Sequence, residues 1–68
     1  MNNYIFIKNK RYFFYGRYGS WNEAYKQAKA YQKKDKKCKY FIIKVEEGYL
    51  FPYEMYKLYL NRVINLSF

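Results

Sequence analysis

The 68-residue sequence contains no histidine and a single cysteine, Cys38, and this scarcity excludes several kinds of site. One cysteine cannot form an intramolecular disulfide, and without histidine it cannot supply four ligands to structural zinc. Neighbouring lysines are expected to lower the pKa of the thiol, but Cys38 has no histidine base, so we expect no catalytic thiol. A lone cysteine is typical of a reducing compartment, which predicts a cytoplasmic protein, in the host cytoplasm if the protein is viral.

Catalytic motifs are absent as well. The sequence has three glycines and five acidic residues, with no glycine-rich phosphate loop and no pair of carboxylates placed for acid–base chemistry. We therefore expect a protein that is not an enzyme, needs no cofactor or metal and has no small-molecule substrate.

Long apolar runs are also missing. No stretch approaches the roughly 18 apolar residues of a membrane-spanning helix. The opening residues MNNYIFIKNK lack the apolar region of a secretory signal. These absences predict a soluble protein without a membrane partner.

Acidic residues are rare in the first two-thirds of the chain, where the whole net charge of +9 resides. Residues 1–45 hold twelve Lys and Arg against Glu23 and Asp35, whereas residues 46–68 hold two against three acids. The chain also has 11 Tyr, 6 Phe and 1 Trp. Basic side chains interleaved with aromatic ones are typical of nucleic-acid-binding proteins. The bias toward Lys, Asn, Tyr, Ile and Phe fits an AT-rich coding sequence and hints at a phage or mobile element.

Two segments near the N-terminus, Tyr4–Lys8 and Arg11–Tyr15, predict a β-hairpin because they are rich in β-branched and aromatic residues. Asn9-Lys10 predicts a two-residue turn, since Asn tolerates positive φ. In this register one face carries aromatic and basic side chains, namely Tyr4, Phe6, Lys8, Arg11, Phe13, Tyr15 and Arg17. The opposite face is predicted to be core and holds Ile5, Ile7, Tyr12 and Phe14. Either the first face stacks bases and binds phosphates, or the last helix of the chain covers it.

A helix is predicted to begin after Ser20, because Ser20 and Glu23 have the spacing of a capping box. Its apolar arc, predicted to be core, comprises Trp21, Ala24, Tyr25, Ala28 and Tyr31. A separate basic arc comprises Lys26, Lys29, Lys33 and Lys37. This arc is either a phosphate-binding face or a solvated face of a basic protein. Residues 26–39 contain seven Lys and one acid, Asp35, and this imbalance favours binding.

Residues 39–45 predict a third strand, and Glu47-Gly48 predicts a turn. Tyr49-Leu50-Phe51 is a candidate short fourth strand. Pro52 fits the first position of a last helix, predicted over Tyr53–Leu66. A chain of this length forms at most one domain, so we expect a single basic α+β domain over 1–68. Its element order is ββαβ(β)α, with a three- or four-stranded antiparallel sheet and two helices.

The predicted last helix has an apolar arc too wide for one side of a two-layer domain. Either this helix is clamped in the core, or the arc is an interface with a partner or a second copy. The arc consists of Met55, Tyr56, Tyr59, Leu60, Val63 and Leu66.

The segment from Tyr15 to Ala24 resembles the strand-to-helix junction of ethylene-response-factor-type DNA-binding domains, a design shared by the arm-binding domains of phage integrases. The residues that carry the resemblance are Gly16, Tyr18, Ser20, Glu23 and Ala24. In that family the sheet enters the major groove and the helix backs it, which implies that Lys8, Arg11 and Arg17 face DNA. The junction is also similar to small phage proteins with a ββαβ core, some of which inhibit host defence systems such as CRISPR nucleases.

These observations predict a non-enzymatic nucleic-acid-binding module that grips the phosphate backbone. The alternative is a small phage-encoded inhibitor that binds a host defence nuclease, or the nucleic acid or acidic patches that the nuclease holds. A third hypothesis is a structural homodimer whose charge is incidental. The expected partners are therefore nucleic acid, a nucleic-acid-bound or acidic host protein, or a second copy of the chain.

Overall fold

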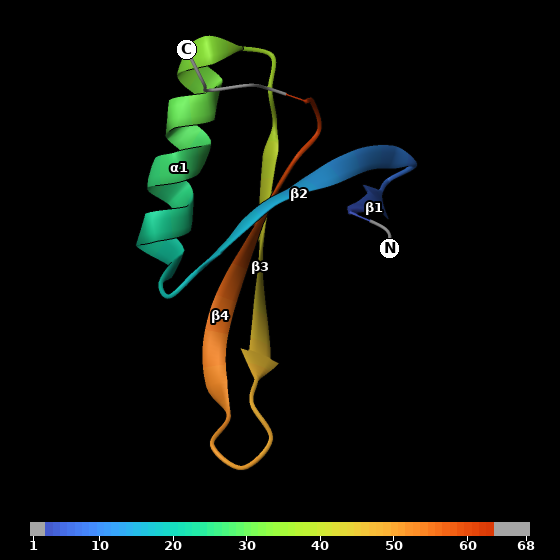
Figure 1. Ribbon diagram of the computed structural model, residues 1–68. Coiled ribbons are helices and arrows are strands. Elements are labelled where there is room, and N and C mark those ends of the chain that lie inside the picture. The colour runs from blue at the N-terminus through green and yellow to red at the C-terminus, as the bar shows by residue number, and fades with distance from the viewer. Residues whose placement is uncertain (1–2, 64–68) are drawn as a thin grey trace.

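Four antiparallel strands and one helix make up the computed structural model, which describes residues 3–63 (Figure 1). The elements are β1 (Tyr4–Ile7), β2 (Lys10–Tyr18), α1 (Trp21–Lys34), β3 (Tyr40–Glu47) and β4 (Tyr53–Leu60). The strand order in the sheet is β1-β2-β4-β3. Because β4 pairs with both β2 and β3, the last strand of the described chain lies in the middle of the sheet. The predicted α+β class and the antiparallel sheet are thus confirmed.

The β1–β2 hairpin forms as predicted, but its turn lies one residue earlier, so each strand partner differs by two residues. The turn is Lys8-Asn9, with φ of 51° and 66°, and Tyr4 pairs with Phe13 instead of Tyr15. Two successive residues at positive φ match the right-handed twist of a hairpin. Both candidate turns consist of Asn9 and one lysine, so residue preference does not distinguish Lys8-Asn9 from Asn9-Lys10.

An irregularity in β2 changes which side chains share a face. Phe14 pairs with Tyr59 and Gly16 pairs with Leu58, so Tyr15 is an extra residue opposite a single step of β4. Such a bulge reverses the alternation of the residues that follow it. As a result Arg17 lies on the face opposite to that of Phe13 and Tyr15.

The helix packs on one face of the sheet through two fully buried alanines, Ala24 and Ala28. Their small side chains let α1 approach Leu58 and Leu60, which are also fully buried. Ser20 caps the helix, since its Oγ accepts a hydrogen bond of 3.2 Å from the Glu23 N–H. The start of the helix and its small-residue contact are therefore confirmed.

Trp21 is not part of this core. Its side chain is 45% exposed and stacks on Tyr25 at 4.9 Å between ring centroids. The prediction that Trp21 is core is wrong, because it lies in the first turn of α1, at the end of the packed face.

The predicted last helix is also wrong, since Tyr53–Leu60 forms strand β4. A central strand contacts neighbours on both edges and is buried in part on both faces, so its sequence lacks polar alternation. Tyr49-Leu50-Phe51 is no strand and belongs to the connection between β3 and β4. Leu66, the end of the predicted helix, lies outside the described residues.

The sheet face opposite α1 is lined by aromatic side chains. Tyr12 is 8% exposed and contacts Phe41 edge-on at 6.5 Å, although β4 lies between their strands. Phe14 and Tyr59 form a second ring contact at 5.6 Å. The sheet therefore curls toward this face, which buries part of it without a second helix.

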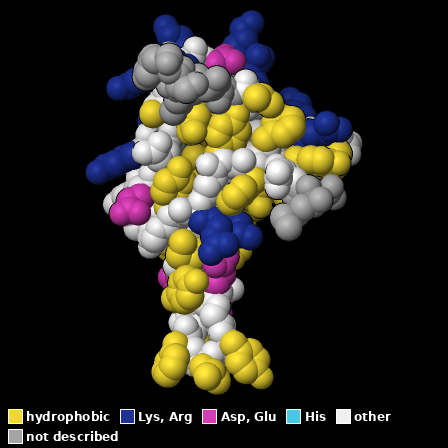
Figure 2. Space-filling model, viewed as in Figure 1, with side chains coloured by type: hydrophobic (Ala, Val, Ile, Leu, Met, Phe, Trp, Pro, Cys, Tyr) yellow, Lys and Arg dark blue, Asp and Glu magenta, His cyan; other side chains and the backbone are white. Residues whose placement is uncertain are grey.

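The β3–β4 hairpin extends beyond the start of α1 and gives the molecule extents of 40 × 25 × 20 Å (Figure 1). Its tip carries three consecutive exposed apolar residues, Tyr49, Leu50 and Phe51, which are 96%, 77% and 86% exposed. In Figure 2 apolar side chains stand at this end, whereas most Lys and Arg side chains gather toward the other end.

Candidate nucleic-acid interface

The basic arc predicted on the helix is present and exposed. Lys26, Lys29 and Lys33 lie on α1, and all three side chains point to solvent. Lys29 Nζ lies 5.4 Å from the ring centroid of Tyr25, which supports the lysine stem on an aromatic face. The arc thus forms a row of cations on the outer surface of the helix.

Lys37 follows the helix instead of belonging to it, because α1 ends at Lys34. Asp35 organises this end: its Oδ1 accepts a hydrogen bond of 3.0 Å from the Lys37 N–H, and its Oδ2 lies 3.5 Å from Arg62 Nη1. Lysines in the last turn also complement the negative end of the helix dipole. Part of the basic character of this end therefore stabilises the helix.

Asn61 connects the segment before β3 to the surface beside the β1–β2 turn. Its Oδ1 accepts a hydrogen bond of 2.8 Å from the Lys39 N–H, and its own N–H donates to the Lys39 carbonyl at 3.1 Å. This reciprocal pair joins the segment before β3 to the segment after β4. Asn61 also lines a depression beside the β1–β2 turn.

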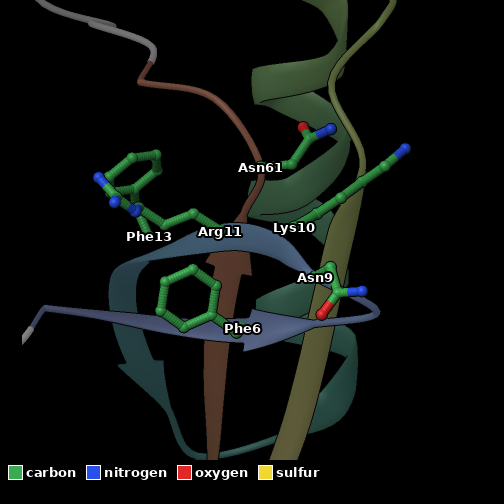
Figure 3. A pocket seen from close by; sticks show the side chains of 6 residues that line it. All are labelled: Phe6, Asn9, Lys10, Arg11, Phe13 and Asn61. Atoms are coloured by element: carbon green, nitrogen blue, oxygen red, sulfur yellow. The ribbon is translucent and has the colours of Figure 1, made fainter.

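The depression has a volume of about 500 Å³ and is open to solvent. Figure 3 shows the six side chains that line it, Phe6, Asn9, Lys10, Arg11, Phe13 and Asn61. They come from β1, the turn, β2 and the segment after β4, so residues from both ends of the described chain meet here. Two aromatic rings, two cations and two amides offer stacking, charge and hydrogen bonding in one place.

Arg11 is held over aromatic rings at this site. Its guanidinium carbon lies 4.7 Å from the ring centroid of Tyr4 and 5.7 Å from that of Phe6. Tyr4 and Phe6 contact each other edge-on at 5.5 Å. A stacked guanidinium keeps its N–H edge available for phosphate oxygens or base edges.

The structure does not bring Lys8, Arg11 and Arg17 onto one sheet face. Lys8 lies in the turn, Arg11 lies on the α1 side beside Phe6, and the β2 bulge places Arg17 on the opposite face. Arg17 also forms an ion pair with Glu47 at 2.5 Å. Of the three, Arg11 and Lys8 remain near the depression.

The two tyrosines of the predicted binding face have structural roles. Tyr15 packs on Tyr31 of α1 at 4.8 Å, and its hydroxyl donates a hydrogen bond of 2.9 Å to the Arg62 carbonyl. Tyr4 supports Arg11. Tyr15 is therefore covered by a helix, but the covering helix is α1 and not the last helix that the sequence predicted.

The six residues of the predicted interface arc do not form a common surface. Met55 and Tyr59 belong to the aromatic face of β4, whereas Tyr56 and Leu60 belong to the α1 face. Tyr59 and Leu60 are 9% and 0% exposed within the single chain. Val63 is 78% exposed, and Leu66 lies outside the described residues. A helical interface through these residues is therefore excluded, because Met55, Tyr56, Tyr59 and Leu60 alternate between the two faces of strand β4.

Cys38 is buried, and its chemistry differs from the prediction. Burial raises the pKa of the thiol, Asp35 adds to this increase, and Arg62 opposes it. The flanking lysines therefore do not lower the pKa as predicted. The Cys38 carbonyl accepts a hydrogen bond of 3.0 Å from Gln32 Nε2, and the residue packs with Leu58 and Leu60. Cys38 thus belongs to the core.

The sequence did not predict that Asn9, Lys10 and Asn61 line one depression. It also did not predict an exposed apolar surface at the tip of the β3–β4 hairpin. Asn61 is separated from the turn by more than 50 residues, and no local pattern indicates that they meet. For the tip the sequence did contain a signal of a connecting loop. The apolar residues Tyr49, Leu50 and Phe51 stand between Gly48 and Pro52, and glycine and proline are typical of turns.

Within residues 3–63 no helix is long and apolar enough to cross a bilayer. The same part of the chain has no cluster of three or more Cys, Asp or Glu that would hold a metal ion. Comparison of the chain with protein-family models, curated proteins and solved structures finds no match.

Proposed function

We propose that this protein is a non-enzymatic nucleic-acid-binding module, of phage or mobile-element origin, that grips the phosphate backbone. The exposed lysines of α1 supply one row of cations, and Lys8, Lys10 and Arg11 at the β1–β2 hairpin supply a second group. Each lysine that approaches a phosphate releases condensed counterions and adds affinity independent of sequence.

The observation that carries this proposal is that most cationic side chains lie away from most carboxylates. Three of the five acids, Glu46, Glu47 and Glu54, lie on the β3–β4 hairpin, toward the apolar tip, and Glu23 lies in the first turn of α1. Glu54 pairs with Lys44 at 2.9 Å, while Asp35 at the basic end pairs with Arg62. A surface adapted for solubility alone mixes positive and negative side chains. A surface region with mainly positive side chains creates an electrostatic field that attracts a polyanion.

The test is the salt dependence of binding to duplex DNA, measured by fluorescence polarisation. Replacing Lys26, Lys29 and Lys33 with Gln should reduce the slope of log K against log salt by about 0.9 for each phosphate that the variant no longer neutralises. Lys44→Gln is the matched control, since Lys44 lies on β3 and pairs with Glu54. An unchanged slope in the triple variant would exclude the helix as the binding face.

A second candidate function is inhibition of a host defence nuclease through contact with the nuclease or its bound nucleic acid. The hairpin tip favours it, because three adjacent exposed apolar side chains are typical of a protein-binding surface. Replacing Tyr49, Leu50 and Phe51 with Ser should abolish inhibition of target cleavage in a CRISPR nuclease assay. Inhibition that survives this change would exclude the tip from that function.

A further inference from the structure

We infer that the depression beside the β1–β2 turn is a pocket for a single unpaired nucleobase, so that the protein prefers single-stranded to duplex nucleic acid. This inference rests on the proposed function and specifies the substrate class. The depression, at about 500 Å³, falls within the range of small-ligand sites, which is about 300–1,000 Å³. A planar heterocycle with its sugar and phosphate fits a site that combines aromatic, cationic and amide groups.

Phe6 provides the stacking surface. Its side chain is 63% exposed even though it contacts both Tyr4 and Arg11. An exposed phenylalanine costs solvation free energy, and most of the other exposed aromatic side chains lie on the open sheet face or at the hairpin tip. Stacking by a base would bury Phe6, as happens on the aromatic platforms of proteins that bind single strands.

Arg11 and Lys10 provide charge at the edge of the same depression. Contact with the rings of Tyr4 and Phe6 restrains the Arg11 guanidinium before any ligand arrives. Preorganised donors lose less entropy when they bind phosphate. The charge therefore lies next to the stacking surface, with the Arg11 guanidinium carbon 5.7 Å from the Phe6 ring centroid.

Asn61 provides a donor of defined orientation. The Lys39 N–H requires an acceptor, so the Asn61 side chain must direct its Oδ1 toward Lys39. Its amide NH₂ is then the group left to offer to a ligand. This NH₂ can donate to a carbonyl oxygen on a base edge or to a phosphate oxygen, so discrimination in favour of a base comes from stacking on Phe6.

The geometry excludes a duplex as the preferred ligand of this pocket. Inside a double helix both faces of each base are covered by neighbouring bases, and Phe6 can reach a base face only after unstacking it. A single strand exposes base faces without that cost. The pocket therefore favours single strands, while the lysines of α1 bind the phosphates of either form.

The experiment compares two oligonucleotides with equal charge in fluorescence polarisation at physiological salt. One is an oligodeoxythymidylate of about twelve nucleotides, within the site sizes common for single-strand binding. The other has the same backbone with abasic sites in place of the bases. The wild-type protein should bind the first about tenfold more tightly or better, and should also prefer it to a duplex of equal phosphate count.

Phe6→Ala should remove this preference, and Phe51→Ala should retain it. Phe51 is the matched control, because it is another exposed phenylalanine that lies at the hairpin tip. Arg11→Gln serves as a second pocket variant and should also lower the preference, so the test does not depend on the folding of one variant.

Equal affinity of the wild-type protein for both oligonucleotides would overturn the pocket and leave backbone binding standing. An equal loss in Phe6→Ala and Phe51→Ala would overturn it too, since the contact would then be a nonspecific aromatic one. Absence of salt-dependent binding to any oligonucleotide would refute the proposed function and the pocket together.

Discussion

Leu58→Ala should remove most of the stability of this fold. Leu58 is fully buried at the centre of β4, where it pairs with Gly16 on one side and Ile42 on the other and packs near Ala28. A buried Leu→Ala change costs about 2.7–5.0 kcal/mol, and the cost rises with the cavity that remains. Gly16 and Ala28 have little side chain to fill such a cavity, so we expect about 4–5 kcal/mol here.

That loss is comparable to the whole stability of a domain of 68 residues, which is about 3–10 kcal/mol at the usual value per residue. The assay is urea unfolding followed by far-UV circular dichroism. With a slope of about 1 kcal/mol per molar urea, the midpoint should fall by about 4 M, or the variant should be unfolded without urea.

Leu50→Ala is the matched control, since Leu50 lies at the hairpin tip and is 77% exposed. Its free energy of unfolding should stay within about 0.5 kcal/mol of the wild-type value. A midpoint for Leu58→Ala close to that of the wild type would refute the position of β4 in the middle of the sheet.

Three further predictions concern pH, the first helical turn and the hairpin connection. Burial raises the pKa of Cys38 and of Tyr31, so the folded state keeps protons that the unfolded chain loses; the free energy of unfolding should fall as pH rises above about 9, and equal urea midpoints at pH 7 and at pH 10 would contradict this. Trp21→Ala should cost about 1 kcal/mol, the value of a partly exposed aromatic pair, and a loss above about 3 kcal/mol in urea unfolding would mean that Trp21 is core. Gly48→Ala should lower the melting temperature, because Gly48 has φ of 98° and an added Cβ would lie 2.7 Å from the Phe51 carbonyl oxygen; an unchanged melting temperature would show that the connection relaxes freely.

The local elements can be predicted from the sequence where a capping residue or a turn residue marks them. Ser20 with Glu23 indicates the start of α1, and Asn9 indicates the first hairpin. The register of that hairpin cannot be predicted, because the pattern of aromatic residues on both strands is compatible with either turn. In the observed register Ile5 pairs with Tyr12, and Tyr12 contacts Phe41 of β3. This contact lies outside the hairpin, so the hairpin sequence does not encode it.

The segment from Tyr53 to Leu60 shows a different limit. Its residues are mostly apolar, and such a run fits a buried helix and a central strand equally well. The central position of β4 follows from its pairing with β2 along one edge and β3 along the other. No local feature of the segment encodes those partners.

One part of the candidate site could be predicted from local sequence, and the other part could not. Lys26, Lys29 and Lys33 were predictable because helical spacing alone places them on one surface. The depression was not, since Phe6 and Asn61 meet only after β4 has paired with β2. The bulge at Tyr15 likewise moved Arg17 to the opposite face. Gly16, which directly follows Tyr15, is the local signal for it, because a glycine inside a strand often marks a bulge.

The central position of β4 also bears on how the chain folds during its synthesis. Strand β2 ends at Tyr18, but its partner on the inner edge is complete only at Leu60, 42 residues later. At elongation rates of about 5–20 residues per second, the ribosome needs about 2–8 s to supply that partner. Throughout this interval β2 offers an unpaired edge and uncovered aromatic rings, which is the state in which strands associate with foreign chains. The interval before Leu60 is synthesised is therefore the period in which the nascent chain is most exposed to such association.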